Sequence, residues 1–481
     1  MRTKRMSDDR QNSQPNAGVP RLGRRSFLGR CAAGGAGLAA AGLHQRLALA
    51  AALEGGGPLA PRPGHFAARA ERLIFVFLTG GFSHVDTFDF KPQLAVDQDK
   101  LVSAVNLRDA GTQPLLASPF QFTPRGQSGL WISELFPKLG DLADDLCVVR
   151  SLHTDIVEHF QATLAMHTGS ATVPLPSIGC WLSYALGTHN SNLPSFVVLA
   201  EHLPYAGAQV WANNFLPPDH QGVRVVPGDE PVADLRSPAR SSTLDELAAR
   251  MLRTLNDRHA AARAEDANLP ARDHSFAVAR GLMREAPEAF DAARESAATL
   301  TAYGIEPGDN RSFAWQCLMA RRLAERGVRV VELIDTGSHD NWDAHGDMQA
   351  HRPKAQRVDQ PLAALLGDLK DRGMFDSTLV VICTEFGRTP WTDAKGTKGR
   401  NHFARAFSSL LAGGGIRGGM AYGETNEHGT AIAADACHVH DFHATILHLL
   451  GLDHERLTYR FAGRDFRLTD VDGHVLRRVI S

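Results

Sequence analysis

Several features that mark large classes of protein are missing from this sequence. The formal net charge is −2 over 481 residues, and no basic stripe with interleaved aromatic side chains is present, so nucleic acid is not an expected partner. There is no GxSxG nucleophile elbow and no Walker A loop, and no GxGxxG stretch leads from a strand into a helical pattern. The sequence therefore predicts neither a serine esterase, nor a P-loop nucleotide site, nor a dinucleotide site. The glycine-rich stretch 413–419 lacks the Lys-Ser/Thr pair of a P-loop and predicts a tight turn.

Cysteines and long apolar runs are scarce as well. The six cysteines are widely spaced, with no CxxC and no Cys/His zinc spacing, so they are expected to be buried core thiols. One disulfide among the five cysteines after residue 50 stays open as an alternative. The uncharged segment 31–43 has 13 residues, whereas a membrane-spanning helix needs about 20. No stable membrane span is therefore expected.

The N-terminal segment has its parts in the order typical of an export signal. A twin-arginine motif at 24–28 is followed by the uncharged segment 31–43 and by a plausible cleavage site at 48–50. A chance Arg-Arg pair before a buried helix is the alternative interpretation. We predict a twin-arginine signal peptide at 1–52 and a flexible linker at 53–70, with export to the periplasm or the extracellular space.

What the sequence does contain is a series of short apolar runs that end in polar loops. The clearest runs lie at 73–78, 146–149, 196–199, 328–334 and 379–382. Short continuous apolar runs separated by helical stretches are typical of strands in a parallel sheet that is covered on both faces. Each run leads into a loop rich in His, Asp, Glu or Gly, and the chain has 22 histidines. Because ligands bind beyond the carboxyl ends of such strands, these loops predict an active site or its remnant.

The rest of the pattern indicates one α/β domain with a helical insertion. Residues 241–300 are rich in Ala, Arg, Glu and Leu at helical spacing, and the α/β pattern resumes near Arg311. We predict one discontinuous α/β domain over 71–481 with a helical insertion at about 241–310, and two independent domains are the less favoured alternative. Residues 128–136 are interpreted as the start of a helix.

The loops after the last two runs carry candidate metal ligands. Residues 339–347 hold three carboxylates and two imidazoles, among them Asp343 and His345. Carboxylate oxygen and neutral imidazole nitrogen are ligands that divalent ions such as zinc and manganese accept. Glu385 follows the next run as a further ligand or a general base, and His402 lies in the loop beyond it. A polar surface loop is the alternative reading of the first segment.

Two arginines in the same region could bind an anion. Arg388 offers a planar fork suited to sulfate, phosphate or carboxylate, and Arg400 is a second cation close to His402. The alternative for Glu385 and Arg388 is a salt bridge at the start of a helix.

A second group of polar residues follows the first two runs. His84 and Asp86 come after a double glycine, where backbone N–H groups can face a bound anion. His153 and His159 follow the second run, and His159 lies near the start of a predicted helix, where anions are favoured. His443 lies near the start of a helix close to the C-terminus. A role as helix cap or core residue is equally open for each of these residues.

Taken together, these segments resemble the domain-of-unknown-function 1501 family, an exported bacterial group related to alkaline phosphatases and sulfatases. The segments that carry the resemblance are 80–86, 341–345, 385–390, 399–402, 440–443 and 463–470. It covers nearly all of the chain past residue 70. The resemblance implies an alkaline-phosphatase-like, three-layer α/β/α sandwich with a mostly parallel central sheet.

The resemblance also implies roles for individual residues. Active members of the related superfamily hold two metals with Asp and His from loops at one sheet edge. The positions that match are Asp343 and His345 in the metal loop, Glu385 as the later acidic ligand and His402 as the distant histidine. The chain departs from the family pattern at four positions. Thr79 and Asn401 stand where the family usually has Asp, and Phe386 stands where a ligand His is usual. His159 lies at or near the position of the hydroxyl or thiol nucleophile. The resemblance therefore implies a site with one metal or none.

Two functions from different classes follow. The first is an exported metal-dependent hydrolase of sulfate or phosphate esters, with a small-molecule or polysaccharide substrate. One divalent ion (Zn, Mn, Ca or Mg) would be bound by Asp343, His345, Glu385 and His402. Arg388 and Arg400 would hold the ester oxygens, and His159 would act as general acid/base or nucleophile. The second is a catalytically degenerate binding or assembly protein of the same fold.

Overall fold

A mostly parallel sheet lies at the centre of the structure, a computed structural model that describes residues 58–105, 110–233, 241–266, 268–394 and 396–481. Its strands are β1 (Arg72–Phe77), β6 (Leu146–His153), β7 (Phe196–Ala200), β8 (Val223–Val225), β9 (Val330–Ile334), β10 (Thr378–Cys383), β13 (Phe407–Ala412), β14 (Met420–Tyr422) and β17 (Cys437–His438). In the described residues these nine strands join in the order β14-β6-β13-β10-β1-β9-β7-β8, and β17 also pairs with β6. The predicted signal peptide lies outside the described residues.

The apolar runs predicted to be strands all belong to this sheet and run in one direction. β1 pairs in parallel with β10 on one side and with β9 on the other, and β9 pairs in parallel with β7. β13, which the sequence analysis did not single out, lies antiparallel between β10 and β6. Because β13 is antiparallel to both neighbours, β6 still points the same way as β1. The carboxyl ends of the predicted strands therefore meet at one edge.

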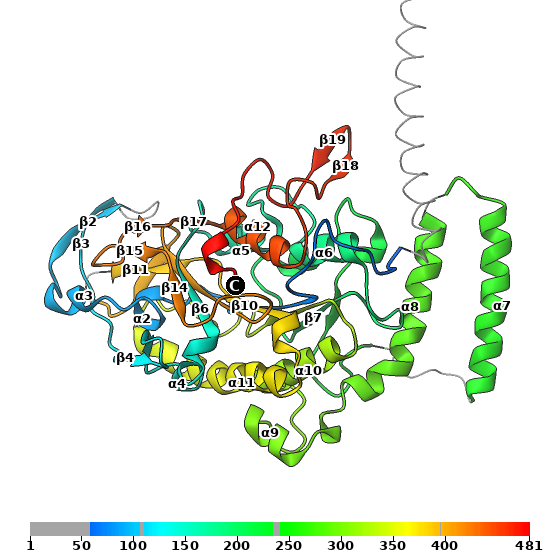
Figure 1. The fold of residues 1–481 in the computed structure, drawn as a ribbon, viewed down its shortest axis with the longest axis horizontal. Helices are drawn as coiled ribbons and strands as arrows, with labels where there is room; N and C mark the ends of the chain where they lie inside the picture. Colours follow the sequence, from blue (N-terminus) through cyan, green and yellow to red (C-terminus); the bar gives the residue numbers. More distant parts are fainter. Residues whose placement is uncertain (1–57, 106–109, 234–240, 267, 395) are drawn as a thin grey trace, which may run out of the picture. The chain divides into compact units, whose positions relative to one another are not determined.

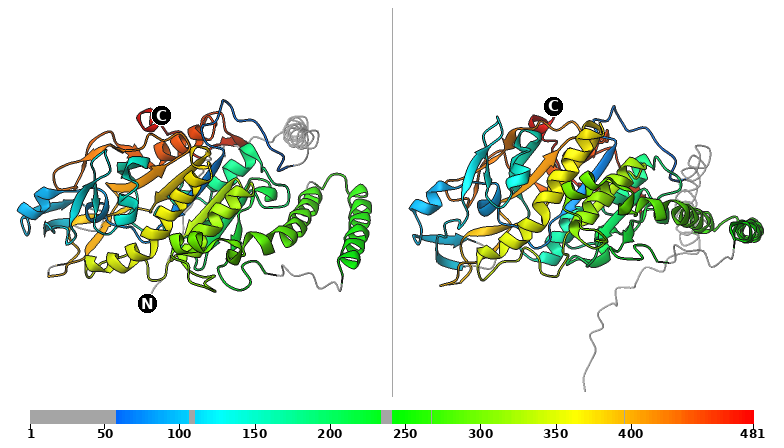
Figure 2. Two further views of the ribbon diagram at one scale, coloured as in Figure 1. Left: turned by 60° about the horizontal axis from the view of Figure 1, so that its bottom comes forward. Right: turned by 90° about the horizontal axis from the view of Figure 1, so that it is seen from below.

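Helices cover both faces of the sheet. They are α5 (His159–Thr168), α6 (Ile178–Leu186), α10 (Phe313–Glu325), α11 (His351–Asp371) and α12 (Val439–Leu449). Alternate side chains of β1 point to opposite faces, so Ile74 and Val76 join the apolar core under α10 and α11. Phe75 and Phe77 join the core under α5, α6 and α12. Figures 1 and 2 show these helices on opposite sides of the strands, which confirms the predicted three-layer α/β/α sandwich.

The stretch interpreted as a helical insertion contains three helices. They are α7 (Ser242–Ala261), α8 (Asn268–Ala289) and α9 (Ala297–Tyr303). α7 and α8 form a hairpin beside the sheet (Figure 1). The Asn256 side-chain amide on α7 donates to Asp273 Oδ1 on α8 at 3.0 Å.

The prediction of a helix at 128–136 is wrong. Instead, β5 (Leu130–Ser133) forms an antiparallel hairpin with β4 (Phe122–Arg125). Two glycines of the connecting turn have φ values of +63° and +69°, which glycine adopts more readily than other residues. Trp131 is exposed between two buried apolar neighbours. This alternation has the period of a strand, and it outweighs the weak helix-start signal.

The remaining helices and strands are short. The strands are β2 (Leu101–Val105), β3 (Ala110–Pro114), β11 (Gly387–Thr392), β12 (Arg400–Phe403), β15 (Glu424–Thr425), β16 (Ile432–Ala434), β18 (Tyr459–Phe461) and β19 (Arg464–Phe466). The helices are α2 (His84–Thr87), α3 (Pro92–Val96) and α4 (Pro137–Gly140). Of these elements, the β11–β12 hairpin matters most for the site described below.

The described part of the predicted linker, residues 58–70, contacts the α/β domain. Arg62 Nη1 donates to the carbonyl oxygen of Tyr184 at 2.5 Å. The backbone N–H of His65 donates to the carbonyl oxygen of Gly451 at 2.8 Å. These bonds tie the segment to α6 and to the end of α12.

The five cysteines in the described residues are buried and form no disulfide with one another. This agrees with their interpretation as core thiols. Among the described helices, none combines the length and the apolar character needed to cross a bilayer.

Candidate metal centre

Three histidines and one aspartate meet beyond the carboxyl ends of the central strands. His159 Nε2 lies 3.3 Å from Asp343 Oδ2. The Nε2 atoms of His345 and His402 lie 2.8 and 3.2 Å from Asp343 Oδ1 and 3.1 Å from each other. Ligand atoms of His159, Asp343 and His402 all lie within 4.8 Å of one another. The structure thus gathers side chains from three distant segments at one point.

Several elements position these side chains. His159 is the first residue of α5, Asp343 and His345 lie in the loop after β9, and His402 lies on β12. In the β11–β12 hairpin, Arg388 stands opposite His402. Because β9 and β10 are parallel neighbours of β1, the loops that follow them meet at one edge of the sheet.

The outer nitrogen of each histidine ring has an acceptor of its own. The Nδ1 contacts are His159 with Glu385 Oε1 at 2.7 Å, His345 with Asp393 Oδ2 at 3.2 Å and His402 with the carbonyl oxygen of Val157 at 2.7 Å. A proton on each Nδ1 satisfies these contacts and leaves the Nε2 lone pairs facing Asp343. Metal-binding histidines are held in this way, with the outer N–H donated to a carboxylate or a carbonyl.

Hydrogen bonds fix the loop that carries Asp343. Asp335 Oδ2 accepts from Trp342 Nε1 at 2.8 Å, and the Trp342 ring is fully buried. Asn341 Oδ1 accepts from the backbone N–H of Asp343 at 3.1 Å, and Asn341 Nδ2 donates to the Tyr205 hydroxyl at 2.9 Å. The two residues before Asp343 are thus anchored, and their anchors set the position of its carboxylate.

The chain passes close to this loop at Gly80. This residue has a φ of +110°, and a Cβ atom there would lie 2.6 Å from the backbone nitrogen of Trp342. Its own N–H donates to Glu385 Oε1 at 2.9 Å. Only glycine meets both the conformation and the close approach.

Electrostatics keep Asp343 ionised. Burial alone would raise its pKa, but hydrogen bonds from three histidines and the charge of Arg388 hold the pKa well below its usual value. Burial also opposes protonation of His159, yet its bonds to Asp343 and Glu385 outweigh burial and raise the His159 pKa. For His402 burial prevails and the pKa is lowered. The lowered pKa favours the neutral form of His402, which is the form that binds a metal ion, whereas the raised pKa of His159 favours its protonated form and opposes metal binding.

Arg388 adds a fixed positive charge beside the histidines. The side chain is fully buried, and its guanidinium donates to the carbonyl oxygens of Gly81 (2.8 Å) and Gly80. Nη2 lies 2.5 Å from Asp343 Oδ1, and Nη1 lies 3.5 Å from His345 Nε2. The backbone carbonyls thus aim the guanidinium at the point where the Nε2 atoms meet.

Glu385, predicted as a ligand, lies behind His159 in the structure. Its buried carboxylate accepts from the N–H of Gly80 and from Thr384 Oγ1, and it contacts His159 Nδ1. The bond from His159 outweighs burial and lowers the pKa of Glu385. Glu385 is therefore placed to orient His159, whose Nε2 faces Asp343.

Arg400 does not point toward the cluster. Its Nε and Nη2 atoms lie 2.7 and 3.1 Å from the two carboxylate oxygens of Asp86, and both side chains are fully buried. Nη1 donates to the carbonyl of Thr389 at 3.0 Å. The predicted pair of ester-binding arginines is thus separated, with Arg388 at the cluster and Arg400 in a structural ion pair.

The structure does not bring the four residues of the predicted additional site together. They contact different neighbours: Asp86 contacts Arg400, His84 stacks on Phe403, His153 lies against His438, and His443 Nε2 lies 2.8 Å from the carbonyl of Met166. Within the described part of the chain, none of the four belongs to a group of three ligand atoms close enough to share an ion.

The spacing of His159, Asp343 and His402 allows them to share one small divalent ion, and His345 contacts Asp343 Oδ1 beside them. Four ligand atoms arranged tetrahedrally at the usual zinc distances lie about 3.4 Å from one another. The contacts between Asp343 and the three Nε2 atoms span 2.8 to 3.3 Å. Three imidazole nitrogens and one carboxylate oxygen are also a donor set that zinc and manganese accept.

A family comparison covers almost the whole described chain. The family described as "Protein of unknown function (DUF1501)" matches residues 70–480. The chain belongs to the DUF1501 family. The resemblance predicted from the sequence is thereby confirmed. None of the curated proteins matches this DUF1501 sequence.

Solved structures similar to this DUF1501 protein share little sequence with it. The lipoteichoic acid synthase LtaP from Listeria monocytogenes is 11% identical, over 85% of this chain and 78% of that chain, with a TM-score of 0.38. A protein in the alkaline phosphatase superfamily from Vibrio parahaemolyticus is 11% identical over 82% and 70%, with a TM-score of 0.37. The PsFucS1 sulfatase from Pseudoalteromonas sp. is 13% identical over 84% and 71%, with a TM-score of 0.36. At these scores the similarities carry no argument about activity.

Three contacts of this DUF1501 site were missed from the sequence. Asp393 lies in the turn between β11 and β12. Its position between the motifs at 385–390 and 399–402 is a sequence signal that could have identified it as part of the site. Tyr205 stacks on His159 with ring centroids 4.2 Å apart. Its sequence signal is that it is an aromatic residue in the polar loop after β7. The carbonyl of Val157 gives no sequence signal, because every residue has one.

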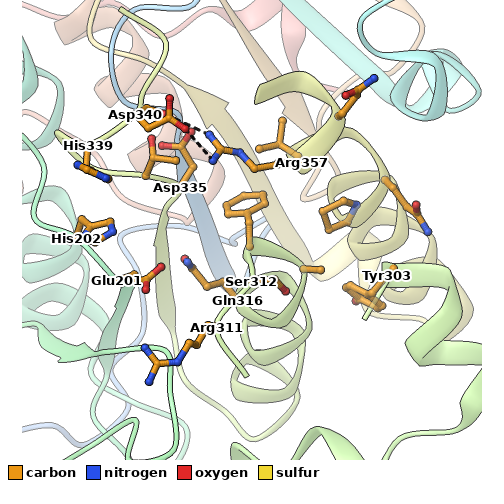
Figure 3. A pocket seen from close by; sticks show the side chains of 18 residues that line it. Glu201, His202, Tyr303, Arg311, Ser312, Gln316, Asp335, His339, Asp340 and Arg357 are labelled. Atoms are coloured by element: carbon orange, nitrogen blue, oxygen red, sulfur yellow. Dashed lines mark hydrogen bonds and ion pairs between the residues drawn. The ribbon is translucent and has the colours of Figure 1, made fainter. Parts of the chain in front are cut away.

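A cavity of about 520 Å³ lies at the carboxyl ends of β7 and β9 (Figure 3). Its polar lining includes Glu201, His202, Arg311, Asp335 and His339. On one side Arg357 lies against Asp340, with Nη1 3.3 Å from Oδ2. Asp340 is three residues before Asp343, so about 10 Å of chain at most separates the cavity wall from the cluster. The volume is typical of a small-molecule site.

Proposed function

We propose that this protein is a metal-dependent hydrolase of sulfate or phosphate esters. One divalent ion would be held by Asp343, His159, His345 and His402. The observation that carries this proposal is the orientation of the three imidazoles, whose Nδ1 atoms face fixed acceptors while their Nε2 atoms converge on one carboxylate. A set of surface histidines has no reason to share that orientation.

The donor set bears on which ion is bound. Imidazole nitrogen suits zinc and manganese, whereas calcium and magnesium prefer a shell made of oxygen. With three nitrogens and one carboxylate, the proposal favours zinc or manganese among the four ions considered. When bound, such an ion supplies Lewis acidity toward an ester oxygen.

The residues around the cluster have distinct tasks in this proposal. Arg388 is aimed at the cluster by backbone carbonyls, so its charge opposes the negative charge that builds on a transferring sulfuryl or phosphoryl group. Glu385 keeps His159 in the tautomer that presents Nε2. The cavity beside Asp340 would receive the part of the substrate that does not react, a small molecule or part of a polysaccharide.

Two observations favour the rival function, a binding or assembly protein without catalysis. Arg388 Nη2 lies 2.5 Å from Asp343 Oδ1 and already balances its charge. Phe386 also packs against His159 and His402, with ring centroids 4.7 and 4.6 Å away, and narrows the space beside them. A site that is neutral and filled can persist for structural reasons.

Metal binding by purified protein tests the proposal. Wild type should bind one zinc or manganese ion per chain in calorimetric titration, and His345→Ala combined with His402→Ala should weaken binding at least 100-fold. His474→Ala is the matched control, because this exposed histidine lies outside both the cluster and the cavity. The metal-loaded protein is then assayed with 4-nitrophenyl sulfate and 4-nitrophenyl phosphate.

The outcomes separate the two functions. Metal-dependent turnover that the double variant loses and the control keeps supports the hydrolase. A wild type that binds the ion but hydrolyses neither of these two esters, nor any ester of a broader panel, supports the function of a binding protein. A wild type that binds no divalent ion contradicts the metal centre itself.

Export through the twin-arginine pathway to the periplasm or beyond is part of the same proposal. Its support is the motif at 24–28 and the uncharged segment that follows it.

A further inference from the structure

Helix α7 turns its apolar side to solvent. The five large apolar residues of this side have exposed fractions between 42 and 61%; they are Leu244, Leu247, Met251, Leu252 and Leu255. Their spacing places all five on one face of the helix. Single exposed apolar residues are common on protein surfaces, but a contiguous stripe marks an interaction site. We call these five residues the α7 stripe.

The neighbouring helix α8 does not cover the α7 stripe. α7 contacts α8 through a different side, where Ala249, Asn256 and Ala260 are half-buried and Asn256 donates to Asp273. At 100° per residue, that side lies about 130° around the helix from the centre of the stripe. The hairpin is therefore held by small and polar contacts, while the large apolar side chains of α7 face outward.

The stripe is complementary to itself. Consider a second α7 lying antiparallel to the first, with a twofold axis that passes between Ala249 and Arg250. The residues that come level with each other are then Leu244 with Leu255, Leu247 with Leu252, and Ala248 with Met251. Every large residue of the stripe meets an apolar residue of the second copy, as an interface with twofold symmetry requires. The match depends on the order of residues in this one helix, so it points to a second copy of the chain.

The charges of α7 agree with the same arrangement. The first half of the helix carries two acidic residues and one arginine, and the second half carries two arginines and one aspartate; the residues are Asp245, Glu246, Arg250, Arg253, Asp257 and Arg258. An antiparallel pair sets the acidic half of one copy beside the basic half of the other, whereas a parallel pair sets like charges together. The polar face has both signs of charge, unlike the basic face of a helix that lies on a membrane.

We propose that two copies of this protein associate through α7, with the two helices antiparallel and the α7 stripes buried against each other. This goes beyond the proposed hydrolase function and does not depend on it, because no residue of the metal centre lies on α7.

Sedimentation velocity of the purified full chain at micromolar concentration tests the association. We expect wild type to sediment as a dimer and Met251→Glu, which puts a charge in the middle of the stripe, to weaken dimerisation at least tenfold. Thr243→Glu is the matched control, with the same new side chain at an exposed, uncharged position about 100° around α7 from the centre of the stripe. It should remain dimeric. The circular dichroism spectra of all three proteins should coincide.

Cysteine cross-linking tests the antiparallel order. An oxidised mixture of Leu244→Cys and Leu255→Cys proteins should give a disulfide between positions 244 and 255, identified by mass spectrometry of the digest. The five described native cysteines are buried and should contribute little. A monomeric wild type, a dimer that survives Met251→Glu, or a 244–244 cross-link would each overturn the proposal. So would binding of wild type to anionic lipid vesicles that Met251→Glu abolishes.

Discussion

At the residue scale, Glu385 shows how a buried carboxylate can act on the site through a neighbour. It lies 2.7 Å from His159 Nδ1 and has no exposed surface. Its remaining contacts, the N–H of Gly80 and the hydroxyl of Thr384, fix the carboxylate in place. The orientation of His159 therefore depends on a group that does not face the point where the ligands converge.

We expect Glu385→Gln to lower zinc affinity about 10- to 100-fold, because an amide holds the His159 N–H less firmly than a carboxylate does. The measurement is a calorimetric titration with zinc. Gln keeps the shape of the side chain, so the urea unfolding midpoint reports separately on any loss of folding. Unchanged affinity in a stable variant would show that Glu385 does not orient a ligand.

Arg400 and Asp86 form a fully buried ion pair, and removing one partner leaves the other charge stranded. We expect Arg400→Met to lower the free energy of unfolding by about 3–5 kcal/mol. The double variant Arg400→Met, Asp86→Leu should recover much of that loss, since it removes both charges. Urea unfolding of the two single variants and the double variant provides the check. A purely additive double variant would contradict a direct pairing.

The sequence predicted the types of residue at the site better than their roles. Asp343, His345 and His402 stand out because a carboxylate and imidazoles follow strands whose ends must meet. That His159 faces Asp343 while Glu385 lies behind His159 could not be predicted. Both lie near strand ends, and which one faces the centre depends on helix placement that residue spacing does not set. Arg400 was expected to bind the ester, but its partner Asp86 lies far away in the chain.

At the scale of elements, the turn after β1 is held against the loop after β9. Gly80 has a φ of +110°, and an added Cβ atom would meet the backbone nitrogen of Trp342 at 2.6 Å. The turn can keep this approach only while residue 80 has no side chain.

Gly80→Ala should cost about 1–3 kcal/mol of unfolding free energy from its backbone conformation, and it should also weaken zinc binding by pushing Trp342 and Asp343 out of place. Gly373→Ala is the control: its φ is also positive, at +65°, but no atom lies within 4 Å of an added Cβ. The control should lose stability and keep its metal affinity. Equal metal affinities for the two variants, by calorimetric titration, would contradict the steric argument.

Elements were predictable where a single pattern governed them. The central strands have continuous apolar runs because both faces of the sheet are covered, and helix α12 has a clear helical period. β5 was predicted wrongly because its apolar residues, Leu130, Trp131 and Ile132, form so short a segment that they fit the start of a helix as well as a strand. β13 escaped notice because Ser408 and Ser409 interrupt its apolar run, although both are fully buried in the structure.

At the scale of the whole molecule, three histidines are buried in neutral form away from the cluster. Burial lowers the pKa of His84 to about 4 and the pKa values of His351 and His443 to about 3. The unfolded chain takes up a proton at each near pH 6.5, and the folded chain does not. Folding is therefore favoured above pH 6.5, and this advantage shrinks as the pH falls from 6.5 toward 4.

We expect the free energy of unfolding to fall by up to about 4 kcal/mol for each unit by which the pH is lowered within this window. This is three times the change that one titrating proton causes. Urea unfolding between pH 7.5 and pH 4.5 measures the slope. His443→Gln should reduce the slope by about one proton, whatever its effect on stability at pH 7.5. A profile that is flat from pH 7 to pH 5 would contradict neutral burial of these histidines.

The fold class could be predicted from the sequence because apolar runs of this kind are compatible with few architectures, and because the recognised motifs span the domain. The pairing of distant segments was not accessible. Nothing in residues 72–77 shows that their neighbours are β9 and β10 and not the strands next in the chain.

That pairing has a consequence for synthesis of the protein. β1 leaves the ribosome early, yet both of its partners follow only after residue 330. Until then a strand with five consecutive apolar residues has two open edges, the condition under which nascent chains aggregate. We therefore expect chains that terminate before residue 330 to be insoluble, and we expect a holding chaperone to bind the unfinished polypeptide.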